Sequence, residues 1–151
     1  MSRDVAPRLG TVDDIPSVAS LFRKVPAENL RYLPVLHTPD EDFRYFRQYL
    51  NAGNRLWIVG DDMRPSGFCA TTPGWIEHLY IDPVWQRHGL GTAFVATAKQ
   101  ENTALRLWAF QRNRAAIQFY SSQGFVLVEQ TDGSGNEEGE PDALFAWQSC
   151  R

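Results

Sequence analysis

The segment 75–110 restricts the fold of this chain more than any other part of its sequence. Residues 75–81 have the aromatic and β-branched composition of a strand, a loop at 82–88 follows, and Leu90 begins a pattern of apolar residues at helical spacing. Residues 105–110 again favour a strand. A strand, a helix and a strand joined by short links form a right-handed crossover, so the two strands are expected to run parallel in one sheet.

The remaining sequence places this crossover in an α/β fold with a mixed sheet, as a single domain over residues 1–151. One helix has a well-specified start, because Thr38 can cap it, Pro39 suits its first position and Glu41 completes a capping box. An earlier helix is expected to end at Lys24–Pro26. The other expected elements are a strand at 6–9, a helix start at Thr11, strands at 55–59 and 67–71 with a turn at 61–66, a helix from Asn113 to Ser122, and strands at 125–130 and 143–147.

Composition narrows the class of protein. A length of 151 residues suits one core, and 43% apolar with 22% charged residues argues against disorder and coiled coil. The formal net charge of -3 and the pI near 5.6 give no net attraction to nucleic acid. Cys69 and Cys150 are too few for a disulfide framework, and no apolar run approaches the ~18 residues of a membrane helix. We therefore expect a cytoplasmic protein without a nucleic-acid or membrane partner.

The loop at 86–92, Gln-Arg-His-Gly-Leu-Gly-Thr, lies between a predicted strand and a predicted helix. The first amides of a helix lack internal partners and carry the positive end of its dipole, so such a loop can bind an anion. Gly89 and Gly91 let the backbone approach a pyrophosphate, and Arg87 and His88 add positive charge. A glycine pair also occurs in ordinary strand-to-helix turns. The motifs of nucleotide-triphosphate loops and dinucleotide folds are excluded, because the lysine and the third glycine that they need are missing.

Two stretches together carry a resemblance to a known family. Residues 79–91, Leu-Tyr-Ile-Asp-Pro-Val-Trp-Gln-Arg-His-Gly-Leu-Gly, resemble the acetyl-CoA motif of the GNAT superfamily of N-acetyltransferases, which reads Gln/Arg-x-x-Gly-x-Gly/Ala. Residues 113–125 resemble the later motif of that family, an Asn followed by an Ala-rich helix that ends in Phe-Tyr and then Gly-Phe. With the order of elements, the resemblance covers nearly the whole chain.

The resemblance implies a mixed, mostly antiparallel sheet that is flanked by helices and has a splayed parallel strand pair, 75–81 and 105–110. The pantetheine arm of coenzyme A would enter the gap and bond the backbone of Leu79 and Ile81, with the Leu79 amide polarising the thioester carbonyl. Asn113, a helix cap by position, would also contact the pantetheine or its phosphate side. The implied coenzyme A contacts are Leu79, Ile81, Gln86, Arg87, His88, Gly89, Leu90, Gly91, Thr92, Asn113 and Tyr120.

Two residues are candidates for the chemistry of amine acylation, which needs a neutral amine and a proton for the departing thiolate. By resemblance, Tyr120 places its phenol beside the sulfur, although a tyrosine on a helix is also commonly a packed aromatic residue. Glu77 precedes Leu79 and Ile81 by two and four residues, so strand alternation predicts that all three share a face and that Glu77 takes the amine's proton. A solvated surface charge is the alternative for Glu77. No metal is needed.

The acceptor is the part that the sequence defines least. The glycine-rich segment 132–142 carries five acidic residues that could attract a cationic acceptor, or could form a solvated turn. The resemblance implies that this segment and the loop after the first helix border the acceptor site. The candidates are Tyr32, His37, Glu137 and Glu138.

The predicted function is direct acetyl transfer from acetyl-CoA to a primary amine of a small molecule or peptide. The alternative is a noncatalytic acyl-CoA-binding sensor or partner-binding module with the same fold. The oligomeric state stays open, a homodimer included.

Overall fold

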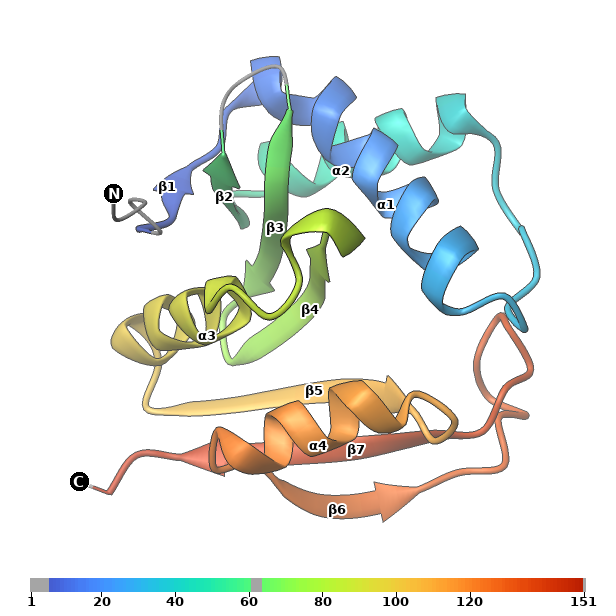
Figure 1. Ribbon diagram of the computed structural model, residues 1–151, viewed down its shortest axis with the longest axis vertical. Helices are drawn as coiled ribbons and strands as arrows, with labels where there is room; N and C mark the ends of the chain where they lie inside the picture. The colour runs from blue at the N-terminus through green and yellow to red at the C-terminus, as the bar shows by residue number, and fades with distance from the viewer. Residues whose placement is uncertain (1–5, 61–63, 151) are drawn as a thin grey trace.

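A single seven-stranded sheet organises the computed structural model, which describes residues 6–60 and 64–150 (Figure 1). The strand order is β1-β2-β3-β4-β5-β7-β6, and the pairs are antiparallel except for β4 with β5, which confirms the predicted mixed sheet. The strands are β1 Arg8–Leu9, β2 Arg55–Gly60, β3 Pro65–Thr72, β4 Trp75–Ile81, β5 Ala104–Phe110, β6 Val126–Gln130 and β7 Asp142–Gln148. The helices are α1 Ile15–Asn29, α2 Pro39–Asn51, α3 Leu90–Glu101 and α4 Arg114–Ser122, with short 3-10 turns at Val12–Asp14 and Pro83–Trp85. In the turn predicted at 61–66, residues 61–63 lie outside the described residues.

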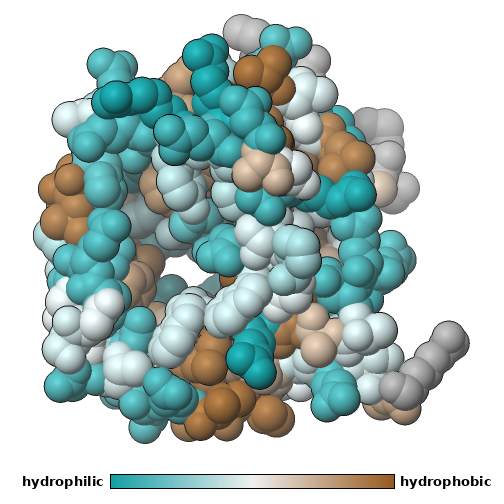
Figure 2. All heavy atoms as spheres, turned by 180° about the vertical axis from the view of Figure 1, so that it is seen from behind, coloured by the Kyte–Doolittle hydropathy of each residue, from teal (hydrophilic) through white to brown (hydrophobic). Residues whose placement is uncertain are grey.

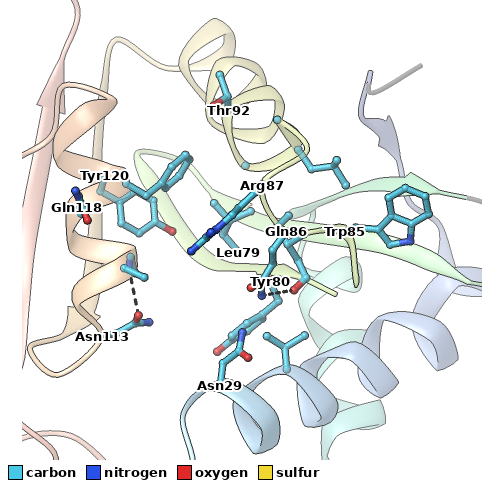
Figure 3. A pocket seen from close by; sticks show the side chains of 18 of the residues that line it. Asn29, Leu79, Tyr80, Trp85, Gln86, Arg87, Thr92, Asn113, Gln118 and Tyr120 are labelled. Atoms are coloured by element: carbon cyan, nitrogen blue, oxygen red, sulfur yellow. Dashed lines mark hydrogen bonds between the residues drawn. The ribbon is translucent and has the colours of Figure 1, made fainter. Parts of the chain in front are cut away.

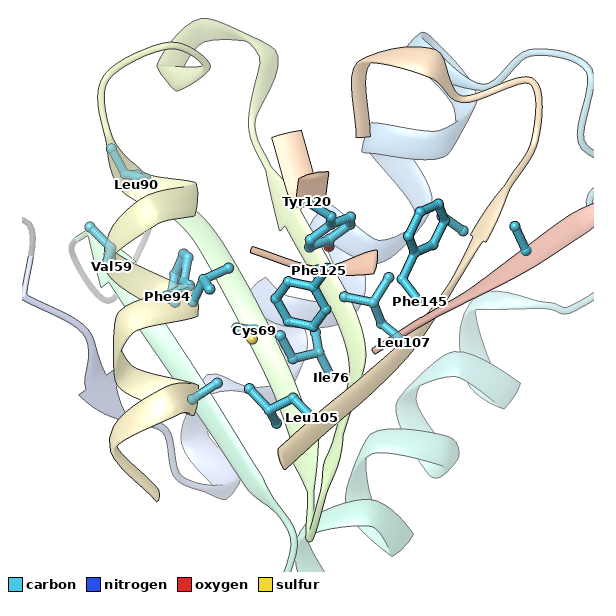
Figure 4. Packing of buried hydrophobic residues seen from close by; sticks show 14 residues of the cluster. Val59, Cys69, Ile76, Leu90, Phe94, Leu105, Leu107, Tyr120, Phe125 and Phe145 are labelled. Carbon is cyan, nitrogen blue, oxygen red and sulfur yellow. The ribbon is translucent and has the colours of Figure 1, made fainter. Parts of the chain in front are cut away.

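Helices cover both faces of the sheet at β3, and the alternation along this strand shows how. Phe68 and Ala70 pack into a core with α1 and α2, whereas Cys69 between them packs into a core with α3 and α4 (Figure 4). Because β3 is covered on both faces, its residues 66–71 are all buried. None of the described helices is long and apolar enough to cross a membrane.

The start of α2 confirms the predicted capping box. The Thr38 hydroxyl accepts a hydrogen bond from the Glu41 amide at 3.2 Å, and the Glu41 carboxylate accepts one from the Thr38 amide at 2.8 Å. Pro39 occupies the first helical position, where a missing N–H costs nothing. The first helix differs from the expected one, since a 3-10 turn follows Thr11 and α1 begins only at Ile15.

The prediction that the first helix ends at Lys24–Pro26 was wrong. Pro26 lies inside α1, which runs on to Asn29. A proline removes one hydrogen bond of the helix, but the additional turn is held by the bond from the Leu30 amide to the Pro26 carbonyl at 2.7 Å and by the burial of Val25 and Leu30. The extended helix ends at the exposed Asn29, and its C-cap Leu30 is buried.

The strands β4 and β5 run parallel, as the crossover predicted, but they diverge almost from their start. Their register contains the single pair Trp75 and Arg106, and beyond it the described part of β4 has no partner on that side (Figure 1). The opening between the diverging strands is the feature of this sheet that can admit a ligand.

Candidate functional site

A cavity of about 740 Å³, the first cavity, opens beside the diverging end of β4. Its walls are the end of α1, the end of β4, the loop 86–92 with the start of α3, and α4 (Figure 3). Every predicted coenzyme A contact except His88 lines it. The cavity therefore brings together two stretches of sequence, 79–92 and 113–120.

The free edge of β4 presents backbone groups to this opening. The Asp82 amide donates to the Ser66 carbonyl at 2.8 Å, while Ile81 is the register partner of Gly67. In an antiparallel ladder, hydrogen-bonded and non-hydrogen-bonded pairs alternate, so the pair Ile81 and Gly67 next to it makes no backbone hydrogen bonds. The pattern repeats every two residues, so Leu79 also makes no backbone hydrogen bond to β3. The backbone groups of Leu79 and Ile81 consequently point away from β3 and toward the gap, where an extended amide chain could pair with them.

One of these backbone groups has a partner within the protein. The Gln86 side-chain amide donates to the Ile81 carbonyl at 3.0 Å. Gln86 thus fixes the loop 86–92 to the strand end. A ligand that pairs with the Ile81 carbonyl would have to share or displace this bond.

The backbone of the loop 86–92 has two residues in the left-handed region. Arg87 has a φ of 67°, and Gly89 has a φ of 83°. A left-handed conformation is strained for a residue with a Cβ, by roughly 1–3 kcal/mol, and such strain concentrates at functional sites. A Cβ at Gly89 would meet no atom within 4 Å, so the space above this residue is open to a ligand. Gly91 differs, because a Cβ there would lie 3.0 Å from the Phe119 ring and would press α3 against α4.

Arg87 supplies the charge of the first cavity. Its side chain extends across the cavity (Figure 3) and makes no hydrogen bond or ion pair with the described residues. His88 does not join it: its ring packs on Trp85, with centroids 5.5 Å apart, outside the cavity lining. Sequence reasoning missed Asn29 and Gln118, which also line the cavity and have no distinguishing motif.

Tyr120 and Asn113 both come from α4. The Asn113 side chain accepts a hydrogen bond from the Ala116 amide at 3.2 Å, which confirms the cap and leaves its amide group at the cavity wall. The Tyr120 ring is buried between Phe119 and Phe125, and its hydroxyl points into the cavity on the side of Leu79 (Figure 3). Burial raises the pKa of this hydroxyl well above its ordinary value, so it is protonated at neutral pH and able to donate.

Glu77 is not where strand alternation predicts it. The register with β3 shifts between Ala70 and Thr71, whose partners are His78 and Ile76, so Glu77 is the additional residue of a β-bulge. Ile76 packs into the core that Leu79 also contacts. The exposed Glu77 carboxylate accepts a hydrogen bond from Thr72 at 3.0 Å and lines neither cavity of the site. The prediction that Glu77 shares a strand face with Leu79 and Ile81 through regular alternation was therefore wrong. Proton transfer by Glu77 stays a prediction.

A second cavity of about 620 Å³ adjoins the first one. The second half of α1, the connection 30–38, Phe110 and Glu138 line it, and Leu30 and Tyr80 line both cavities. Seen from behind, the molecular surface is hollowed near its centre (Figure 2). The two cavities therefore share part of their walls.

Tyr80 was missed by sequence reasoning, because it lies on the strand face opposite Leu79. The same face holds His78, whose Nε2 lies 2.8 Å from the Tyr45 hydroxyl. Burial lowers the pKa of His78 to about 4, so this histidine is neutral at physiological pH. Burial and the nearby Glu138 carboxylate raise the pKa of Tyr80 to about 12.

The connection 30–38 and the hairpin 131–141 meet at the edge of the second cavity. The His37 Nε2 lies 2.7 Å from the Glu137 carboxylate, and this contact raises the pKa of His37. The Arg112 guanidinium stacks 4.0 Å from the Tyr32 ring centre and also lies 3.4 Å from Glu140. Of the four predicted acceptor residues, His37 and Glu138 line the cavity, while Tyr32 and Glu137 hold its border together.

A family model described as an acetyltransferase (GNAT) domain matches residues 52–127. This range contains β4, the loop 86–92, α3, β5 and α4. It therefore covers most of the first cavity and ends before the hairpin 131–141.

Two curated relatives match a similar part of the chain. Peptidyl-lysine N-acetyltransferase YiaC of Escherichia coli (strain K12) is 32% identical over 80 residues, which cover 52% of this chain and 53% of that protein. An uncharacterized N-acetyltransferase of Methanocaldococcus jannaschii is 29% identical over 86 residues, which cover 46% of this chain and 38% of that protein. The chain thus spans about half of the length of one relative and less of the other.

Solved structures match over nearly the full chain. The apo form of YjaB from Escherichia coli superposes with a TM-score of 0.73 at 17% identity and covers 96% of this chain and 98% of that one. The putative acetyltransferase yncA from Salmonella typhimurium, solved with acetyl-CoA, has a TM-score of 0.76 at 14% identity and covers 97% of this chain and 94% of that one. At these identities the likeness shows the fold.

Proposed function

This chain belongs to the GNAT family of acetyltransferases, and on that premise we propose that it transfers an acetyl group from acetyl-CoA directly to a primary amine. One observation carries the proposal. The first cavity, lined by Tyr120 and the other predicted coenzyme A contacts except His88, shares Leu30 and Tyr80 with the second cavity. A thioester in the first cavity would then face an amine in the second.

The residues of the first cavity suit the parts of acetyl-CoA. The loop amides from Arg87 to Gly91 and the unpaired Arg87 side chain would hold the pyrophosphate. The outward backbone groups of Leu79 would pair with the pantetheine arm, and its amide would hold the thioester carbonyl oxygen as negative charge develops there. Bound in this way, acetyl-CoA supplies the activated acetyl group.

Tyr120 is the proposed proton donor. The carbon–sulfur bond breaks with its electrons on sulfur, and a protonated phenol near that atom stabilises the thiolate as it forms. The support is the direction of the Tyr120 hydroxyl, which points into the first cavity on the side of Leu79.

The acceptor enters through the second cavity in this proposal, with His37 and Glu138 at its walls and Tyr32 and Glu137 at its border. YiaC is named for peptidyl-lysine, and a lysine side chain is one of the primary amines that would fit here. We also propose a cytoplasmic location, which the two free cysteines, Cys69 and Cys150, support.

Thiol release from acetyl-CoA across a panel of primary amines and lysine peptides tests the proposal. We expect release that depends on the amine and a product that is heavier by one acetyl group. Acetyl-CoA binding without amine-stimulated release from any member of the panel would instead support the noncatalytic sensor.

A further inference from the structure

The acidic residues of the hairpin 131–141 and the start of β7 differ in one respect, which is whether their charge has a partner. Each of four is engaged: Asp132 accepts from the Ser134 amide, Glu137 contacts His37, Glu140 pairs with Arg112, and Asp142 accepts from Thr131 and Asn136. Glu138 has no hydrogen bond or ion pair with the described residues. A half-buried carboxylate without a partner is unusual, because burial favours pairing.

None of the described cations that line the second cavity forms an ion pair with Glu138. Among the cations of the second cavity, Arg23 pairs with Asp42 at 2.8 Å and Lys24 pairs with Asp82 at 3.0 Å. His37 contacts Glu137, and Arg31 is exposed to solvent. Glu138 is thus the half-buried anion of this cavity that remains available to a ligand.

The position of Glu138 connects it to the reaction centre. It lines the same cavity as Tyr80, and after burial its negative charge is the next cause of the raised pKa of Tyr80. Tyr80 also lines the first cavity, where Tyr120 and Leu79 lie. A cation held between Glu138 and Tyr80 would therefore stand at the junction of the two cavities.

Resting on the proposed function, we propose that Glu138 is a catalytic residue that binds the ammonium group of the acceptor and takes its proton, directly or through one water. The acceptor class is then a primary amine that is protonated in solution. Strand alternation predicted this role for Glu77. Glu77, however, lies on the bulge of β4, and its carboxylate accepts a hydrogen bond from Thr72.

The proton balance of the step is complete with these groups. One ammonium proton passes to Glu138, which leaves a lone pair on nitrogen. The nitrogen bonds to the acetyl carbon, the carbon–sulfur bond breaks toward sulfur, and Tyr120 donates its proton to that sulfur. The second nitrogen proton restores Tyr120 through solvent, and Glu138 releases its own proton to solvent. The products are the amide, the coenzyme A thiol and one proton.

The test compares Glu138→Gln with Asp132→Asn on two classes of amine. Asp132→Asn removes the same charge from the same hairpin but lines neither cavity. For an alkylamine that is protonated at the assay pH, we expect Glu138→Gln to lower kcat/KM by about a hundredfold, the scale of losing one proton acceptor. For a hydrazide that is neutral at that pH, we expect a loss below about tenfold. Glu138→Asp should recover part of the alkylamine rate.

Three results would overturn the assignment to Glu138. These are an equal loss for both classes of amine, a loss no larger than that of Asp132→Asn, or a selective loss in Glu77→Gln in place of Glu138→Gln. If none of the amines stimulated thiol release by the wild-type enzyme, that result would refute the proposed function instead. In that case, NMR titration with an alkylamine still decides the ammonium contact, since Glu138→Gln should weaken binding severalfold, and unchanged binding would contradict it.

Discussion

The two cavities are similar in size but are built in different ways. Most of the first one is made from two continuous stretches, 79–92 and 113–120, on strand ends and helices that pack on one core, and the end of α1 completes its wall. The second one depends on loops that are 100 residues apart, which meet through His37 and Glu137. The comparison teaches that the site for the shared substrate, coenzyme A, is encoded locally, while the acceptor site is a product of tertiary contacts.

The unpaired charges of the two cavities have opposite signs. In the first cavity the unpaired charge is that of Arg87, beside the loop amides. In the second cavity the half-buried unpaired charge is that of Glu138. An anionic ligand is favoured on one side and a cationic ligand on the other, which suits an acyl donor with phosphates and an acceptor with an ammonium group.

Gly89→Asp should have the largest effect on the first cavity. The new carboxylate would enter the open space above the loop and repel the pyrophosphate, so we expect coenzyme A affinity to fall on the order of a hundredfold. Gly53→Asp is the matched control, because Gly53 has a φ of 85°, equally open surroundings and no place in either cavity. Calorimetric titration with coenzyme A measures both, and equal affinity in the two folded variants would place the pyrophosphate elsewhere.

Tyr120→Phe acts at the wall of the first cavity and should separate catalysis from binding. Since the ring still packs between Phe119 and Phe125, acetyl-CoA affinity should change little while kcat falls roughly ten- to a thousandfold. Tyr49→Phe removes a hydroxyl that is buried without a partner away from both cavities, and it should keep kcat. A wild-type kcat in Tyr120→Phe would leave Tyr120 as a packed aromatic residue.

Glu137→Gln should have the smallest effect, confined to the second cavity. It weakens the contact that joins the two loops, so we expect KM for the amine to rise about two- to fivefold with coenzyme A affinity unchanged. The contact raises the pKa of His37, so its contribution is present when His37 is protonated and is lost as pH rises through that pKa. NMR titration of His37 should show that its pKa falls toward the ordinary value in Glu137→Gln. An unchanged pKa would show that contacts other than the one between His37 and Glu137 join the two loops.

Sequence reasoning reached most of the fold and most of the first cavity. The capping box of Thr38, the strand at 75–81 and the helix that ends at Ser122 depend on local interactions, which a sequence pattern records directly. The loop 86–92 and the helix that became α4 were found because they resemble two motifs of the family. Local patterns failed at Pro26, where the buried Leu30 and the bond from its amide to the Pro26 carbonyl hold the following turn.

The parts that were not predicted depend on register and on distant contacts. A bulge in β4 changes the face pattern around Glu77 without any marker in the sequence. Tyr80 and Asn29 enter the site because of how α1 and β4 converge. The pairing of every acidic hairpin residue except Glu138 becomes visible only when the partners, such as His37 and Arg112, are in place.

A structure of the protein with a nonhydrolysable acetyl-CoA analogue is the most direct measurement of the central claim, that the two cavities hold the two substrates and meet at the acetyl group. The account predicts the pyrophosphate on the amides of the loop 86–92, the thioester carbonyl at the Leu79 amide, and the acetyl group facing Tyr80 and the second cavity. Density for the acyl arm in the second cavity, or with the acetyl group turned away from Tyr80, would contradict it.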